Sequence, residues 1–167
     1  MDNFYEQLET VVDFTNYKMI KMAMYVFGVL AFLCLFTVQI IPLIFSVIIA
    51  VVAFFMKKKA YVEYEYVLTN GVIDIDAIYD QKKRKRLISF DAKDMELLAE
   101  ANSVYVKDFS NKPDKELKCF QAKTTKIVYI AMITGGVTRL QFMFTPDKGF
   151  LDLCYKYNPR AVKRAIR

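Results

Sequence analysis

Residues 22–56 read MAMYVFGVLAFLCLFTVQIIPLIFSVIIAVVAFFM and contain no charged side chain. A helix that crosses the roughly 30 Å hydrocarbon core of a bilayer needs about 20 apolar residues. At a rise of about 1.5 Å per residue, one straight helix over this run would be about 50 Å long, which is too long for one span without strong tilt. The run therefore predicts two membrane-spanning helices that fold back on each other.

The predicted break lies at Gln39-Ile40-Ile41-Pro42. Proline has no backbone N–H and fits the first turn of a helix, and Gln39 is the most polar side chain of the run. We expect helices over about 18–38 and 42–56, the second of them short for a span. Two alternatives stay open. One is a buried hairpin of a soluble protein, although soluble helices normally carry a polar face, and the other is a single kinked span.

Lysines flank the run on both outer sides, and none lies at its apex. Positively charged flanks are retained preferentially in the cytoplasm. The sequence therefore predicts an integral membrane protein with both termini and the C-terminal domain in the cytoplasm. The lysines expected at the membrane interface are Lys18, Lys21, Lys57, Lys58 and Lys59.

The first 17 residues predict an amphipathic helix, because Phe4, Leu8 and Val12 follow one another at helical spacing. The segment is acidic, which favours packing on protein over electrostatic attraction to a membrane. It is expected either along the membrane or docked on the C-terminal domain. The order is then an amphipathic segment (1–17), a transmembrane hairpin (18–56), a linker (57–60) and a cytoplasmic domain (61–167).

The domain is basic, since residues 57–167 hold 22 basic and 14 acidic side chains. Its apolar residues recur with period two, which is typical of β-strands. Asn70-Gly71 predicts a type I′ hairpin turn, because both positions of that turn need a positive φ. Seven antiparallel strands are expected, near 61–68, 73–79, 86–90, 95–99, 117–122, 126–134 and 137–145.

Some of these elements leave alternatives. Residues 94–109 can form one strand, two strands or a partly helical segment, and Gly135-Gly136 is expected to make the last hairpin. A C-terminal helix is predicted after Thr145 as N-cap and Pro146 as first residue. Its expected inward positions are Phe150, Leu153, Cys154 and Tyr157. Asn158-Pro159 should end it, before a short basic tail helix over 160–167.

Two motifs carry a family resemblance. They are YEYVLTNGVIDID at 64–76 and RKRLISFDAKDMELL at 84–98. Together with the two-span leader, they resemble the membrane-anchored, PH-like domains of bacterial proteins of unknown function. The resemblance is clearest from Met1 to about Leu98. It implies an α+β PH-like fold, with seven antiparallel strands capped by a C-terminal helix behind a membrane hairpin, and it brings no known activity.

Five consecutive cations form the one charge cluster of note: Lys82, Lys83, Arg84, Lys85 and Arg86. We expect them in a turn near 80–85, where they can contact anionic lipid headgroups or an anionic partner. The alternative is a solvated turn whose charges keep edge strands from pairing with other chains. Nucleic acid is not expected as a partner, since the sequence has no reading helix and no RNA-binding strand motif.

The chain has no histidine and three scattered cysteines without C-x-x-C spacing. This removes histidine-based acid–base catalysis and the commonest zinc sites. Asp74 and Asp76 are expected to pair with lysines across strands. No catalytic residue, metal or cofactor is predicted. We expect a non-enzymatic, membrane-tethered module that localises or scaffolds a protein partner at the cytoplasmic membrane face, or else a sensor of anionic headgroups through residues 82–86.

Overall fold

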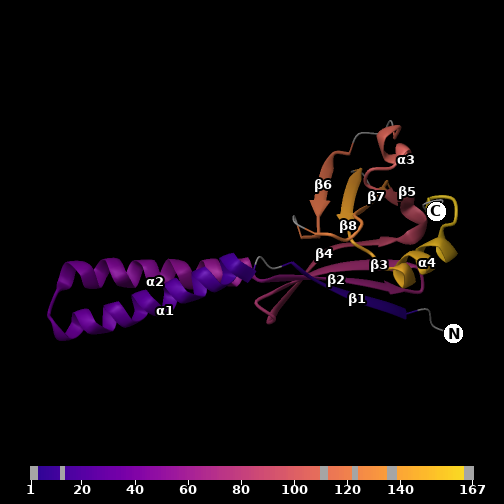
Figure 1. Cartoon of the computed structure of the whole chain (residues 1–167). Coiled ribbons are helices and arrows are strands. Elements are labelled where there is room, and N and C mark those ends of the chain that lie inside the picture. Colours follow the sequence, from indigo (N-terminus) through magenta and orange to yellow (C-terminus); the bar gives the residue numbers. More distant parts are fainter. Residues whose placement is uncertain (1–3, 12–13, 110–112, 122–123, 135–138, 164–167) are drawn as a thin grey trace. The chain divides into compact units, whose positions relative to one another are not determined.

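The computed structural model describes residues 4–11, 14–109, 113–121, 124–134 and 139–163. The chain forms two compact units, each assembled from separate stretches (Figure 1). The β-unit comprises Met1–Val11, Tyr64–Ala77 and Arg84–Arg167, and the hairpin unit comprises Val12–Glu63 and Ile78–Lys83.

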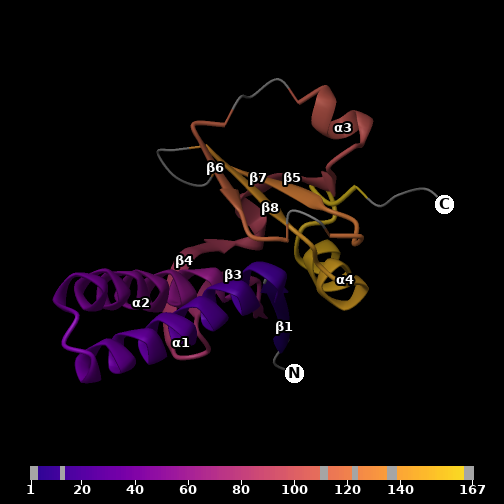
Figure 2. The same ribbon diagram turned by 60° about the vertical axis from the view of Figure 1, so that its left-hand side comes forward.

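Two long helices make up most of the hairpin unit. α1 (Phe14–Phe36) and α2 (Ile40–Ala60) lie side by side in opposite directions (Figures 1 and 2). Between them, Val38 has a φ of 55°. Pro42 lies in the first turn of α2, where a backbone N–H has no partner within the helix. The predicted break between two helices is confirmed.

α2 is longer than the sequence predicted. It begins at Ile40 and continues through Lys57–Ala60, so the residues expected as a linker form its last turn. Lysine favours helix, and its charge is stabilised near the C-terminal end of the helix dipole, which explains the extension. The 23 residues of α1 and the 21 of α2 correspond to about 34 and 31 Å.

Both helices are long and apolar enough to cross a membrane, and their most apolar 18-residue stretches have mean hydropathies of 2.2 in α1 and 2.6 in α2. Their large apolar side chains point outward: Phe36 is 73% exposed and Ile41 is 72% exposed. A hairpin in the core of a soluble protein would hide such side chains.

The N-terminal segment is a strand, so the predicted amphipathic helix is wrong. β1 (Phe4–Val11) lies beside β2 at the edge of a sheet. Phe4 and Leu8, expected as the buried face of a helix, are more than half exposed. The alternate residues Tyr5 and Gln7 instead bond residues about 140 positions later in the chain, and such long-range contacts override a local helical pattern.

The first sheet has the order β1-β2-β3-β4, with β2 (Val62–Thr69), β3 (Val72–Tyr79) and β4 (Lys83–Asp91). The turn between β2 and β3 has φ values of 50° at Asn70 and 96° at Gly71, which confirms the predicted type I′ turn. Between β3 and β4, Asp80 and Gln81 also have positive φ values, of 50° and 55°.

The second sheet has the order β5-β7-β8-β6. Its strands are β5 (Met95–Glu100), β6 (Lys115–Lys118), β7 (Tyr129–Ile133) and β8 (Leu140–Phe144). β5–β7 and β7–β8 are antiparallel, but β6 runs parallel to β8, with Lys115 opposite Leu140. The described residues thus form eight strands, one more than predicted, and not all pairs are antiparallel. The extra strand is β1.

Two short helical pieces flank β5. η1 (Ala92–Asp94) precedes it and α3 (Val104–Lys107) follows it, so the partly helical alternative for 94–109 is the one observed. The predicted hairpin at Gly135-Gly136 lies outside the described residues.

The last helix, α4 (Lys148–Tyr157), starts later than expected. Asp147 is its N-cap and accepts a hydrogen bond from the Phe150 amide at 2.9 Å, so the prediction of Thr145 as cap is wrong. Phe150 and Cys154 are buried as predicted, and the helix ends before Asn158-Pro159. Residues 161–163 pair with the edge of β5 instead of forming a tail helix, and 164–167 lie outside the described residues.

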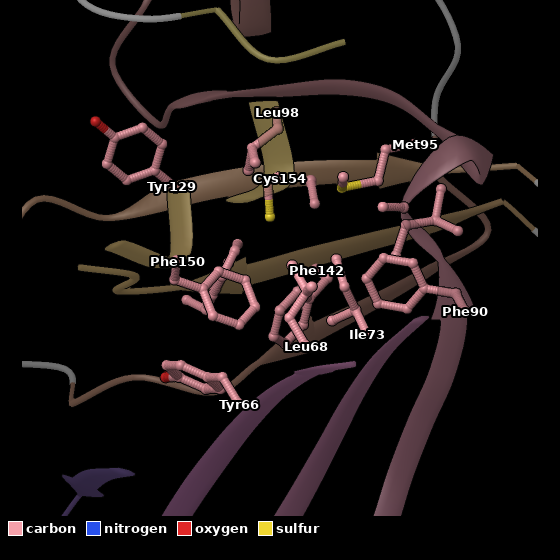
Figure 3. Packing of buried hydrophobic residues seen from close by; sticks show 14 of the residues in the cluster. Tyr66, Leu68, Ile73, Phe90, Met95, Leu98, Tyr129, Phe142, Phe150 and Cys154 are labelled. Carbon is pink, nitrogen blue, oxygen red and sulfur yellow. The ribbon is translucent and has the colours of Figure 1, made fainter. Parts of the chain in front are cut away.

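Aromatic side chains fill the core of the β-unit (Figure 3). Tyr66 lies edge-on to Phe144, with ring centroids 5.4 Å apart, and its hydroxyl donates to the backbone oxygen of Cys119. Phe150 of α4 packs edge-on against Phe144 at 5.8 Å. These contacts join β2, β8 and α4 into one hydrophobic core.

Candidate functional site

The five-cation run does not form a turn. Lys82 closes the β3–β4 turn, where its amide donates to the Tyr79 oxygen at 3.0 Å, and the other four cations belong to β4. Side chains alternate along a strand, so Arg84 and Arg86 point the same way and Lys83 and Lys85 are offset from them. The prediction of a turn over 80–85 was wrong, because the chain already reverses direction at Asp80 and Gln81, which both have positive φ values.

The two arginines bind carboxylates of the neighbouring strands. Arg84 Nε lies 2.8 Å from Asp76 Oδ2, and Arg86 Nε lies 2.5 Å from Asp76 Oδ1. Arg86 also pairs with Asp74 at 2.8 Å, and Arg84 pairs with Glu65. The hydrogen bond to Asp76 raises the pKa of the Arg86 guanidinium. The aspartates were expected to pair with lysines, but their partners are arginines, whose forked guanidinium suits a carboxylate.

The ion pairs distinguish the two arginines of the run from its three lysines. Asp76 is only 2% exposed, so the arginines serve to neutralise a buried carboxylate. Lys82, Lys83 and Lys85 are exposed, and no ion pair is seen for them among the residues that the structure describes. These three lysines carry the unpaired charge of the run, whereas Arg84 and Arg86, which are also exposed, are paired with carboxylates.

Within the hairpin unit, the β3–β4 turn lies at the basic ends of the two helices. Lys57 Nζ is 3.9 Å from Asp80 Oδ1, and the Asp80 amide donates to the Tyr61 oxygen at 3.0 Å. Gln81 Nε2 donates to the Tyr61 hydroxyl at 2.8 Å. The turn is therefore held next to the last turn of α2.

The expected interface lysines gather at this same end. Lys18 and Lys21 lie in the first two turns of α1, and Lys57–Lys59 lie in the last turn of α2. The Tyr17 and Tyr61 rings meet edge-on, 5.5 Å apart, and so connect the two helix ends. The Tyr61 hydroxyl donates to Glu63 at 2.8 Å, which raises the pKa of Tyr61. Tyrosine and lysine are the residues that populate membrane–water interfaces.

A groove of about 580 Å³ lies beside α4 in the β-unit. Gln7 forms part of one side, with Nε2 donating to the Thr145 oxygen and Oε1 accepting from the Asp147 amide, both at 2.8 Å. The Tyr5 hydroxyl donates to Asp147 Oδ2 at 2.7 Å, which raises the pKa of Tyr5. Because the sequence predicted a helix over residues 1–17, it missed that β1 helps to build this groove.

The lining of this groove mixes apolar and charged groups. Ile127 and Leu151 supply apolar surface, while Lys148 and Asp152 place opposite charges on α4. A groove of this size and mixture has the general character of a ligand site.

Two cysteines, Cys119 and Cys154, are buried in the core of the β-unit. Burial raises the pKa of the Cys119 and Cys154 thiols to about 12, so both stay protonated at neutral pH and are poor nucleophiles. No group of three or more side chains able to hold a metal ion occurs among the described residues.

One family model matches the chain over residues 1–164, and its description is Bacterial PH-like domain (DUF6106). The match includes both long helices as well as the strands, which confirms the resemblance seen in the two strand motifs. No curated protein and no solved structure matches the chain.

Proposed function

The chain belongs to this bacterial PH-like domain family, and we propose that it is a non-enzymatic, membrane-tethered interaction module. In this proposal α1 and α2 span the membrane, and the β-unit holds a protein partner at the cytoplasmic face. The observation that carries it is the place of β1, which precedes the helices in sequence and belongs to the same unit as the strands that follow them.

A folded unit cannot be divided across a bilayer, because unpaired strand edges are not tolerated in hydrocarbon. Met1–Val11 and Arg84–Arg167 share the β-unit, which supports an arrangement with the outer ends of α1 and α2 on one side. This supports a double span over a single kinked span. Five lysines at those ends support the cytoplasmic side.

The groove beside α4 is the proposed partner site. Its volume falls within the range of about 300–1,000 Å³ that is usual for ligand sites, and α4 presents both charged and apolar groups to it. The absence of histidine from the sequence and the protonated state of Cys119 and Cys154 support a non-enzymatic role. No cofactor is proposed.

Site-specific photo-crosslinking in cells tests this function. A photoreactive amino acid replaces Lys148, which lines the groove, or Lys156, an exposed lysine of the same helix that does not. We expect the full-length protein to form one discrete cross-linked product from position 148 and none from position 156. Absence of any product, or equal products from both positions, would contradict the proposed groove.

A second candidate function is sensing of anionic lipid headgroups. It is favoured by one observation: Lys82, which closes the β3–β4 turn, and Lys83, the first residue of β4, belong to the hairpin unit, whose turn lies beside the lysines of α2. Each lysine near an anionic leaflet contributes about 1 kcal/mol to binding. Arg84 and Arg86 contribute less than the sequence suggested, since Asp76 already pairs with both.

An environment-sensitive fluorophore tests the sensor function. It is attached at Gln81→Cys in a protein whose native cysteines are replaced, and the full chain is reconstituted in liposomes. We expect its emission to shift to the blue with a rising fraction of anionic lipid, to shift back with salt, and to respond less after Lys82→Gln with Lys83→Gln. The matched control is Lys118→Gln, an exposed lysine of β6. Emission that does not change with the fraction of anionic lipid would exclude the sensor function.

A further inference from the structure

A second groove, of about 480 Å³, lies along β4 in the β-unit. Six consecutive residues of this strand, 85–90, line it. Successive side chains of a strand point to opposite faces, so a groove over one face would be lined by every second residue. Contact with consecutive residues means that the groove follows the edge of β4.

The opposite wall is a face of the second sheet. Ile133 pairs with Leu140, and Leu140 pairs with Lys115, so these three side chains form a row across β7, β8 and β6. Leu117, two residues after Lys115, lies on the same face. All four line the groove. An occupant would therefore meet a strand edge on one side and apolar side chains on the other.

The outer edge of β5 is hydrogen-bonded to residues 161–163, whereas β4 has no strand beyond it among the described strands. Ala161 and Lys163 cover β5, with the Leu98 amide donating to the Ala161 oxygen at 2.9 Å and the Lys163 amide donating to the Leu98 oxygen at 2.8 Å. β4 stands at the end of its sheet and has one strand neighbour, β3, among the described strands. Every second N–H and C=O of such an edge is free to pair with another chain.

We propose that the edge of β4 binds an extended, acidic segment of a partner protein as an added strand. Charge selects this occupant: the exposed Lys85 and Lys115 line the groove, against one acidic side chain, Asp94. Arg86 also lines it, but its charge is already paired with Asp74 and Asp76. The added strand sets carboxylates beside the two lysines and apolar side chains against Leu117 and Leu140, while its backbone pairs with β4.

A second copy of this chain fits the edge poorly. Pairing of β4 with another β4 would bring together two strands that each carry four cations and one acidic residue, and this like charge opposes the pairing. The proposal also does not depend on the groove beside α4, since the two grooves share no residue.

Peptide selection on the full-length protein tests this inference. Random 12-residue peptides displayed on phage are selected against the chain in nanodiscs of zwitterionic lipid, with empty nanodiscs as background. We expect enrichment of acidic sequences with alternating apolar residues. Lys85→Glu with Lys115→Glu should weaken the affinity of an enriched synthetic peptide by roughly tenfold or more, because attractive charges become repulsive. The matched control, Lys118→Glu, changes the other face of β6 and should leave affinity within about twofold.

Methylation of the peptide backbone separates strand addition from simple charge attraction. N-methylation of alternate amides should abolish binding for the set that faces β4 and spare the set that faces away. The proposal is overturned if no peptide is enriched, if enriched peptides bind the Lys85→Glu, Lys115→Glu protein equally well, or if neither N-methyl set affects binding. Binding of anionic vesicles to the same lysines without peptide enrichment would assign the edge to lipid and also overturn it.

Discussion

The hairpin unit and the β-unit place the same kind of side chain in opposite surroundings. Phe36 of α1 is 73% exposed, whereas Phe142 of β8 is fully buried. In α1 apolar residues cover the whole circumference, but in the β-unit they alternate with polar ones and face a shared core. The difference shows that apolar character alone does not indicate burial. The spacing of the apolar residues along the element separates the two cases, because a protein core is contacted from one face only.

Phenylalanine truncation should separate the two units most strongly. Phe142→Ala removes a ring from the core and should lower the free energy of unfolding by about 3–5 kcal/mol. Phe36→Ala, at an exposed position, should change it by less than about 0.5 kcal/mol. Denaturant unfolding of the full chain in detergent, followed by circular dichroism, measures both. Equal effects would mean that the two environments do not differ as described.

The same contrast extends to charged side chains within β4. Arg86→Met leaves the buried Asp76 with fewer hydrogen bonds and should destabilise the protein by about 1–3 kcal/mol. Lys85→Met removes an exposed cation and should change stability by no more than about 0.5 kcal/mol. The same unfolding measurement applies. A larger loss of stability for Lys85→Met than for Arg86→Met would contradict the distinction between paired arginines and unpaired lysines.

The stability of the β-unit should depend on alkaline pH through its two buried thiols. Burial raises the pKa of Cys119 and Cys154 to about 12, above an ordinary value of 9.0. Between those values the folded state binds more protons than the unfolded state, so stability present below pH 9 is lost as pH rises. The loss is at most about 1.4 kcal/mol per pH unit for each thiol. Unfolding between pH 8 and 10 should show a shallower decline for Cys119→Ala with Cys154→Ala, and an unchanged slope would argue against buried thiols.

Glycine replacement gives the smallest expected difference. Gly28 of α1 has no atom within 4 Å of an added Cβ, so Gly28→Ala should gain up to about 1 kcal/mol in helix stability. At Gly149 of α4 the added Cβ would lie 2.6 Å from the Tyr5 hydroxyl. Gly149→Ala should therefore lose that gain, because Tyr5 must shift away from Asp147.

A double-mutant cycle checks the cause at Gly149. In a Tyr5→Ala background the clash is absent, and Gly149→Ala should become stabilising by roughly 0.5–1 kcal/mol. If the substitution remains unfavourable without Tyr5, β1 does not pack against α4 as described.

The sequence alone determined the features that depend on neighbouring residues. The uncharged run with Pro42 predicted a break between two helices, Asn70-Gly71 predicted a left-handed turn, and the spacing of Phe150 and Cys154 predicted the inward face of α4. Each follows from chain stereochemistry or from a period within a few residues, so no distant partner was needed.

Only the tertiary structure decided what β1 and the cation run do. β1 carries a helical spacing, yet strand pairing and the bonds from Tyr5 and Gln7 to the start of α4 make it a strand. Arg84 and Lys85 are neighbours in sequence, yet one binds a buried carboxylate and the other lines an open edge. The partners of Tyr5 and Gln7 in β1 lie about 140 residues away, and Asp76, which Arg84 binds, lies across the β3–β4 turn, on a strand whose register decides which side chains meet. A local pattern of apolar or charged residues does not specify either pairing.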